Sequence, residues 1–231
     1  MKSTRILITA TLALLATPLA IAQDSKPKPA PSAKPAAAPA STAPAPSPVV
    51  AKQVPSYPMT TCVACGKALP EHPVEYVKGN RLYRLDAEAC QKAVDSDAAG
   101  MAKKIDEAVI AQQKATYPLK TSPVSDKALE AGAVDHVYGT RLVRLASAEE
   151  VAAFEKDPAA AMAKVDKALI DSQLASYTMK KCPVSGEDLG EGGSEPVNYL
   201  YGTKLVRFCC KKCPVAFEKD PAKYMKAMAA K

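Results

Sequence analysis

Short apolar runs that fit β-strands occur three times in the chain, each before a Gly-containing pair and a second alternating run. The first run covers 74–77 and precedes Gly79-Asn80 and the pattern Leu82-x-x-Leu85. Because Gly adopts positive φ without steric cost, this order is typical of a tight β-hairpin. The sequence therefore predicts three hairpins, and the other two are built from 134–138 with Gly139-Thr140 and from 197–201 with Gly202-Thr203.

Helix signals follow the predicted hairpins. Asp157-Pro158 and Asp220-Pro221 each place a capping carboxylate before a proline at the first helical position, which is a common helix start. Ser147 with Glu150 has the spacing of a capping box for an earlier helix. Two helices are expected after each hairpin, which gives an α+β fold class.

These elements recur because the chain contains an internal repeat. Tyr57-Pro58-Met59 returns as Tyr117-Pro118-Leu119 and as Tyr177-Thr178-Met179, at a constant spacing of 60 residues. Self-similarity at a fixed period marks a row of similar supersecondary units. We predict repeat 1 at 55–116, repeat 2 at 117–176 and repeat 3 at 177–231, each a small unit of a Cys-turn, a hairpin and two helices.

The chain before residue 55 lacks this pattern. Lys2 and Arg5 precede an apolar run that ends at Ala20-Ile21-Ala22, as in a secretory signal peptide. Eight prolines lie between Pro27 and Pro48, in a composition with too little large apolar surface to fold. We predict a signal peptide at 1–22, a disordered Pro/Ala/Lys-rich linker at 23–54, and a periplasmic or secreted protein with no transmembrane segment after signal cleavage.

Composition excludes several classes of function. The chain of 231 residues has a formal net charge of +7 and only two histidines, so a haem protein or a His-rich metal site is not expected. No basic stripe with interleaved aromatic residues points to nucleic acid. The sequence shows no nucleophile–base pair and no phosphate-binding glycine loop, and we expect no enzymatic activity.

The seven cysteines fall at corresponding places in repeats 1 and 3. The opening turns contain Cys62 and Cys65 in repeat 1 and Cys182 in repeat 3. Cysteines after the hairpins are Cys90 in repeat 1 and Cys209, Cys210 and Cys213 in repeat 3. Combining the repeats gives CxxC in a turn and CxxC at a helix start, which is the arrangement of a four-cysteine zinc site.

This alignment makes specific expectations about geometry. In repeat 3, Cys182, Cys210 and Cys213 are expected to converge, with Cys209 as a spare or fourth ligand, since residues three apart share a helix face. In repeat 1, one open position is expected to be filled by water, Asp86 or His72. Repeat 2 has substitutions at all four positions and is predicted to bind no metal; the residues there are Ser122, Ser125, Ser147 and Glu150.

Repeat 3 combines the segments 182–186 (CPVSG) and 207–213 (RFCCKKC) with Tyr201-Gly202, Phe217, and Asp220-Pro221 followed by Tyr224. On these residues it resembles a YHS or TRASH-type domain, a small treble-clef-like module associated with heavy metals. The resemblance covers most of 177–231, and repeats 1 and 2 are similar to that family only through the internal alignment. It implies metal ligation by Cys182, Cys213 and one or both of Cys209 and Cys210.

Two functions follow as alternatives. The first is an exported metal-binding protein that holds a soft transition metal, zinc or copper, through thiolates in repeats 1 and 3. The second is a structural or interaction protein of the cell envelope, with an envelope protein as partner, in which the cysteines are relic ligands or disulfides. A thiol–disulfide enzyme is disfavoured because no thioredoxin-like βαβ pattern surrounds Cys62-x-x-Cys65.

Overall fold

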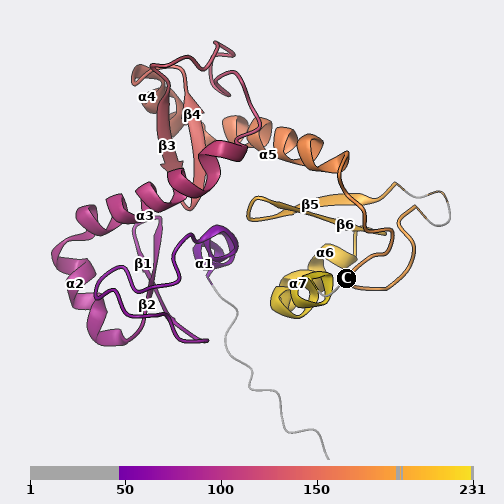
Figure 1. Cartoon of the computed structure of the whole chain (residues 1–231), viewed down its shortest axis with the longest axis horizontal. Helices are drawn as coiled ribbons and strands as arrows, with labels where there is room; N and C mark the ends of the chain where they lie inside the picture. Colours follow the sequence, from indigo (N-terminus) through magenta and orange to yellow (C-terminus); the bar gives the residue numbers. More distant parts are fainter. Residues whose placement is uncertain (1–46, 191–192, 194, 230–231) are drawn as a thin grey trace, which may run out of the picture. The chain divides into compact units, whose positions relative to one another are not determined.

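A computed structural model of the chain describes residues 47–190, 193 and 195–229. Its described elements are mixed α and β, with three two-stranded antiparallel sheets that are each followed by helices (Figure 1). The α+β class is therefore confirmed. The predicted signal peptide at 1–22 and the predicted linker up to residue 46 lie outside the described residues.

The three predicted hairpins are present and share one register. Gly79, Gly139 and Gly202 have φ of 61°, 65° and 66° and occupy the first position of each two-residue turn. That position requires glycine in a type II′ turn, whose twist matches that of the flanking strands. The paired strands are β1 (Val74–Lys78) with β2 (Arg81–Leu85), β3 (Val134–Tyr138) with β4 (Arg141–Leu145), and β5 (Val197–Tyr201) with β6 (Lys204–Phe208).

Two helices follow each hairpin, as predicted. Repeat 1 also has 3₁₀ turns, η2 (Glu88–Cys90) and η3 (Lys114–Thr116). The carboxylates of Asp157 and Asp220 accept backbone N–H groups at the second helix starts, at 3.2 Å each, and confirm the predicted caps. The helices are α2 (Gln91–Ser96) and α3 (Ala98–Gln113), then α4 (Glu149–Lys156) and α5 (Pro158–Leu174), then α6 (Cys213–Lys219) and α7 (Pro221–Ala229).

The capping box predicted from Ser147 and Glu150 is wrong. Helix α4 begins after Ala148, which makes no side-chain cap. The carboxylate of Glu150 instead turns to the two serines of the opening turn. A local spacing rule fails here because partners distant in sequence offer better donors.

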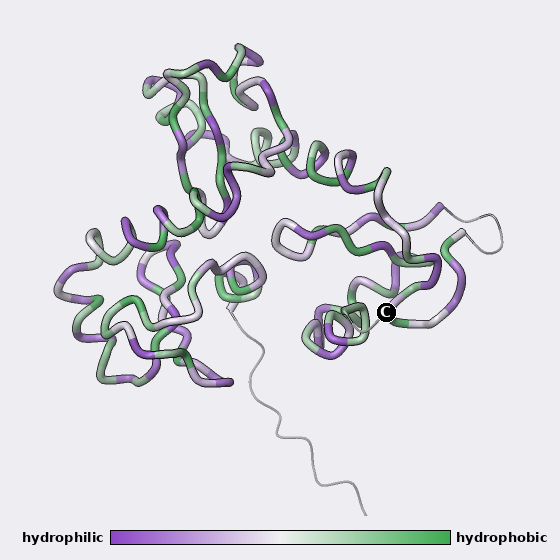
Figure 2. Tube along the Cα trace, in the orientation of Figure 1, coloured by the Kyte–Doolittle hydropathy of each residue, from purple (hydrophilic) through white to green (hydrophobic). Residues whose placement is uncertain are grey.

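Each repeat has its own hydrophobic core, and the first core reaches into repeat 2. Val94, Phe154 and Phe217 occupy the same place in the three repeats and are fully buried. Leu142 of β4 belongs to the cluster of repeat 1, beside Val109 of α3. Hydrophobic and hydrophilic positions alternate along α3 and α5 in Figure 2, as expected for helices with one buried stripe.

A glutamine at the end of each preceding helix holds the next hairpin. Gln113 of α3 donates to the carbonyl of Thr140 and accepts from the N–H of Leu142, both at 2.9 Å. Gln53 and Gln173 make the corresponding pairs of bonds with the first and third hairpins. The glutamines therefore recur at the period of the repeat and satisfy backbone groups beside each turn.

The predicted linker at 23–54 extends too far, because Gln53 and the residues before it belong to a helix. Residues assigned to its last part form helix α1 (Pro48–Gln53) and enter the 3₁₀ turn η1 (Val54–Ser56). Val50 and Gln53 of α1 are buried. The prolines at 44–48 suggested a linker, although helix α1 ends in the same way as α3 and α5.

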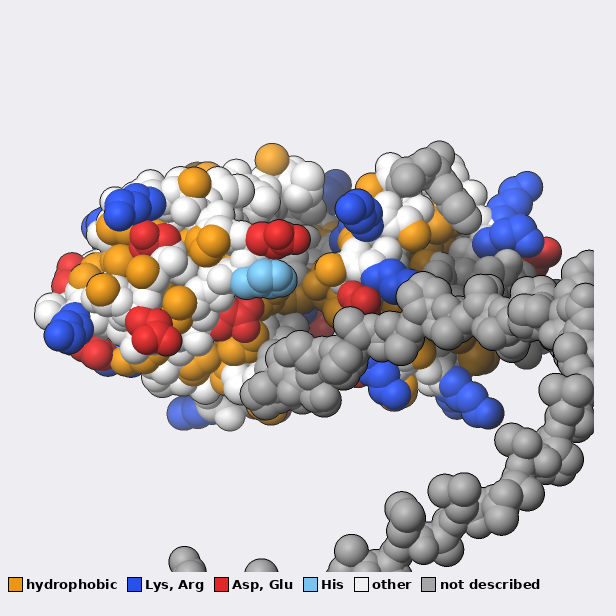
Figure 3. Space-filling view, turned by 90° about the horizontal axis from the view of Figure 1, so that it is seen from below, with side chains coloured by type: hydrophobic (Ala, Val, Ile, Leu, Met, Phe, Trp, Pro, Cys, Tyr) orange, Lys and Arg blue, Asp and Glu red, His pale blue; other side chains and the backbone are white. Residues whose placement is uncertain are grey.

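The surface has mixed charge. Figure 3 shows basic and acidic side chains interspersed with hydrophobic ones on one face. Within the described part of the chain, no helix is both long and apolar enough to cross a membrane.

Candidate metal centres

The opening turn of each repeat has one backbone geometry, whatever side chains it carries. In repeat 1 the N–H of Gly66 donates to the carbonyl of Cys62 at 2.8 Å, and the N–H of Cys62 donates to the carbonyl of Lys67 at 2.7 Å. Equivalent bonds form at Ser122 and at Cys182. The turn therefore presents its first and fourth side chains to the same side in all three repeats.

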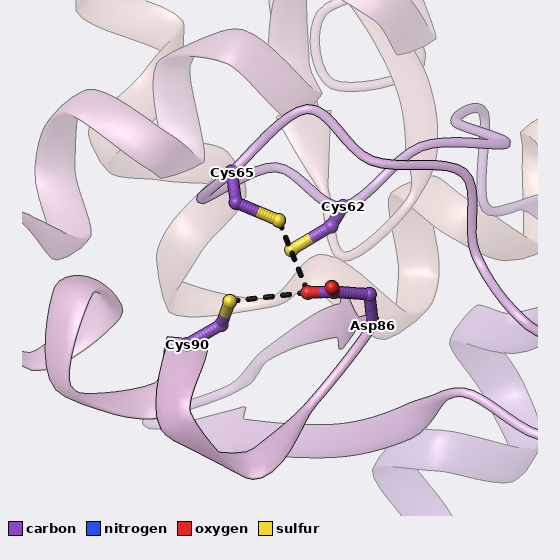
Figure 4. Close-up of side chains that lie close together, drawn as sticks. All are labelled: Cys62, Cys65, Asp86 and Cys90. Atoms are coloured by element: carbon purple, nitrogen blue, oxygen red, sulfur yellow. Dashed lines mark hydrogen bonds between the residues drawn. The ribbon is translucent and has the colours of Figure 1, made fainter.

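In repeat 1 this turn meets the junction between β2 and the first helical turn. Asp86 follows the end of β2, and Cys90 lies in η2. The three cysteine sulfurs and one carboxylate oxygen lie within 4.8 Å of one another. Figure 4 shows the four side chains of Cys62, Cys65, Asp86 and Cys90 pointing toward one another. Two thiolates bound to one tetrahedral zinc ion are separated by about 3.8 Å, so the cluster could hold a metal ion after a small contraction.

Hydrogen bonds show how this cluster distributes protons without a metal. The thiols of Cys65 and Cys90 donate to Asp86 Oδ1 at 3.0 and 3.1 Å. These bonds lower the pKa of Asp86 to about 2, and the same carboxylate raises the pKa of Cys90 to about 12. Burial opposes ionisation of Cys62, but backbone N–H groups of Asp86, Cys65 and Ala64 lower its pKa overall. A cation that displaces the thiol protons would find four anionic donors.

In repeat 3 the described cluster is Cys182, Cys209 and Cys213, whose sulfurs lie within 4.8 Å of one another. The expected roles of the adjacent cysteines are reversed. Cys209 is buried inside the cluster, whereas Cys210 is exposed and outside it. The sulfurs of Cys210 and Cys213 are 3.6 Å apart, as their spacing of three residues predicts. Cys209, which directly follows β6, is nevertheless the residue that converges with both Cys182 and Cys213.

The repeat 3 cluster has polar neighbours that favour one thiolate. Burial would raise the pKa of Cys182, but the Ser185 hydroxyl and the N–H groups of Ser185, Cys209 and Val184 lower the pKa to about 7. Burial and the adjacent thiols raise the pKa of Cys213. Cys209 also donates to Glu187 Oε2 at 3.2 Å. Three soft sulfur donors thus converge, and oxygen atoms of Ser185 and Glu187 lie within hydrogen-bond distance of Cys209.

Repeat 2 fills the same space with a carboxylate. The hydroxyls of Ser122 and Ser125 both donate to the carboxylate of Glu150 at 2.5 Å. The N–H of Ala146 donates to it as well, at 3.0 Å. Burial disfavours the charge, but these donors lower the pKa of Glu150 overall. The anion thus lies where a cation would lie in repeats 1 and 3, surrounded by donors instead of ligands.

The structure keeps the alignment of the repeats but changes which aligned positions carry the candidate ligands. Asp86 corresponds to Cys209 and to Ala146, each being the first residue after the second strand. The shared pattern after the hairpin is a pair of donors four residues apart, Asp86 with Cys90 and Cys209 with Cys213. The repeat spacing that matches Leu85 with Phe208 already aligns Asp86 with Cys209, but it does not show which of Cys209 and Cys210 joins the cluster.

His72 is exposed in a bend and lies outside the cluster. All seven cysteines are free thiols in the described structure. The chain matches no protein family, no curated protein and no solved structure. The candidate function therefore rests on the geometry of the two clusters.

Proposed function

We propose that this chain is a metal-binding protein that holds a soft transition metal ion at each of two cysteine clusters. The observation that carries the proposal is the convergence of sulfur donors from an opening turn and a strand–helix junction in repeats 1 and 3. A tetrahedral ion bound by thiolates from two such segments is a common zinc arrangement. The proposed role is binding, since the convergent ionisable groups are sets of metal ligands.

The donor sets favour particular ions. In repeat 1 the carboxylate of Asp86 joins three sulfurs, and zinc accepts both kinds of ligand whereas Cu⁺ prefers sulfur alone. We assign Zn²⁺ to repeat 1. In repeat 3 the three buried thiols suit either Zn²⁺ or Cu⁺, with an oxygen ligand completing a zinc site.

The proposal also includes export of the protein and a role in handling heavy metals. The signal-like sequence at 1–22 supports export to the periplasm or outside the cell. The resemblance of repeat 3 to YHS or TRASH-type domains supports a role in handling heavy metals. The competing role, an envelope interaction protein with disulfide-bonded or relic cysteines, differs in the state of its thiols and is decided by the same measurement.

The test is metal uptake by the full chain after reduction and removal of metal under anaerobic conditions. Titration with Zn²⁺ should end at about two ions per chain, one for each cluster. Titration with Co²⁺ should give the intense thiolate-to-metal absorption of a tetrahedral sulfur site. Cys90→Ser and Cys182→Ser should each remove one ion, and the double variant should remove both.

Ser125→Ala is the matched control, because it changes the position in repeat 2 that corresponds to Cys65 without touching either cluster. This variant should keep both ions. If the reduced wild-type chain takes up no Zn²⁺, Co²⁺ or Cu⁺, the metal-binding function is wrong. A chain purified from the periplasm with fewer than seven free thiols and no metal would support the disulfide-bonded alternative instead.

A further inference from the structure

Cys210 is the one cysteine of the chain that lies outside both clusters, and it lies beside one of them. Its side chain is exposed. Its sulfur is 3.6 Å from the sulfur of Cys213, which is the same distance as that between Cys209 and Cys213 inside the cluster. Cys213 therefore has one sulfur neighbour facing the cluster and one facing solvent.

The distance between the sulfurs of Cys210 and Cys213 fits two ligands of one metal ion. Two thiolates on one tetrahedral zinc ion are about 3.8 Å apart, given zinc–sulfur bonds of about 2.3 Å. A metal ion bound by Cys213 could thus also bind Cys210 without a rearrangement of the backbone between them. Zinc sites accept a fifth ligand for a short time during exchange.

Repeat 1 supplies a natural comparison. Ala87 stands at the position of Cys210, two residues after the end of the second strand, and it is exposed as well. The cluster of repeat 1 has its fourth donor in Asp86, and its exposed thiol, Cys65, is itself one of the four donors and not an additional sulfur beside them. The cluster of repeat 3 has three sulfurs and an accessible fourth one next to them.

We propose that Cys210 is an exchange ligand through which the ion of repeat 3 passes to and from external thiols, and this inference rests on the proposed metal-binding function. The Cys210 sulfur bonds to the ion while its proton leaves to solvent. The bond between the ion and an oxygen ligand at the edge of the cluster then breaks, and that position takes a thiolate of the acceptor. Each cluster thiolate that then leaves the ion takes up one proton, and each acceptor thiol that binds the ion gives one up, so no oxidant or reductant is needed. The partner class is a thiol-bearing metal carrier.

The test compares rates of zinc transfer from the loaded full chain to an excess of a dithiol acceptor, followed by stopped flow. The wild-type chain should show a fast phase from repeat 3 and a slow phase from repeat 1. Cys210→Ala should slow the fast phase by at least about tenfold, with the same number of ions bound. Ala87→Cys should accelerate the slow phase, because it adds the exchange ligand to repeat 1. Both positions are exposed, so neither change alters a core.

A second readout separates an exchange ligand from a permanent one. Iodoacetamide should alkylate Cys210 in the zinc-loaded chain while Cys182, Cys209 and Cys213 stay protected, as read by peptide mass spectrometry. The inference is overturned if Cys210→Ala transfers zinc at the wild-type rate, if that variant binds one ion fewer, or if Cys210 is protected in the loaded chain. A wild-type chain that takes up no metal would instead overturn the proposed function and this inference together.

Discussion

Repeats 1 and 2 have the same turn, hairpin and helix pair but opposite chemistry at the point where these elements meet. In repeat 1 three sulfurs and a carboxylate surround a space that could hold a cation. In repeat 2 a single carboxylate occupies that space and accepts three hydrogen bonds. The corresponding residues are Cys62, Cys65, Asp86 and Cys90 in repeat 1, and Ser122, Ser125, Ala146 and Glu150 in repeat 2.

The comparison shows that this fold does not need a metal to close the junction. The backbone bonds of the opening turn are the same with serines as with cysteines. What the junction needs is a group that links the turn to the start of the first helix. Glu150 provides this link directly, whereas repeat 1 provides donors for an ion and links its elements through the hydrogen bonds of Asp86 with Cys65 and Cys90.

The strongest test of this difference between the repeats is to give repeat 2 the side chains of repeat 1. The quadruple variant Ser122→Cys, Ser125→Cys, Ala146→Asp, Glu150→Cys should bind one further Zn²⁺ per chain, because the backbone already presents these positions together. Structural zinc ions in small domains contribute about 10–16 kcal/mol of binding free energy, so this is the largest expected effect. Zinc titration against a competing chelator measures it.

The control for that experiment is Glu150→Cys alone. It removes the carboxylate but leaves both serines, so it should bind no additional ion. If the quadruple variant folds, as judged by its circular dichroism, and still binds no further zinc, the geometry of the turn is not what makes repeat 1 a candidate site.

Removing the carboxylate of Glu150 from repeat 2 should have a smaller effect, a loss of folding stability. Glu150→Ala leaves two serine hydroxyls and the N–H of Ala146 without their acceptor, and bonds to a charged group are worth about 1.5–3 kcal/mol each before water replaces part of them. We expect the free energy of unfolding of the metal-free chain to fall by about 2 kcal/mol. Urea denaturation measures this change, and Glu150→Gln should recover part of it.

The matched change in repeat 1 is Cys90→Ala in the metal-free chain. Cys90 makes one side-chain bond there, to Asp86, so its loss should cost less than the loss of Glu150. Equal destabilisation by the two variants would mean that the carboxylate of repeat 2 does not replace an ion as a link between the elements.

The smallest expected effect is a pH dependence that belongs to repeat 2. The pKa of Glu150 is lowered in the folded chain, so its contribution to stability is complete above the ordinary Glu value of about 4.3. It is lost as the pH falls through the folded pKa, because the unfolded chain then binds the proton more readily. Urea midpoints measured between about pH 6 and pH 3 should therefore fall more steeply for the wild type than for Glu150→Gln. Parallel curves would assign the acid sensitivity to other carboxylates.

Much of the fold was predictable because its signals are local. Gly79 has the positive φ that its turn requires, and Asp157 caps the helix that follows it. Interactions over two to four residues determine both features. The helical end at Gln53 was missed because the proline-rich composition before it suggested a linker, although Gln53, Gln113 and Gln173 share the 60-residue spacing.

The candidate site was predictable only in part. The repeat alignment brought Cys62, Cys65 and Cys90 together, and it named Asp86 among the possible fourth donors. It made Cys210 a ligand and Cys209 the spare, whereas the structure groups Cys209 with Cys182 and Cys213. The spacing showed that Cys210 lies beside Cys213, but it could not show which cysteine also reaches Cys182. It also could not show that the carboxylate of Glu150 reaches the two serines of the opening turn.

The sequence by itself determined the period, the hairpins, the helix caps and which repeats carry sulfur donors, since each depends on residue type and short spacing. Only the tertiary structure decided which side chains share a centre. The opening turn and the strand–helix junction are more than 20 residues apart, as Cys62 and Asp86 are. Whether Cys209 or Cys210 joins Cys182 and Cys213 depends on the path of the chain where β6 ends, and the structure places Cys209 there. The spacing of the cysteines alone does not distinguish the two, because both lie within a few residues of Cys213.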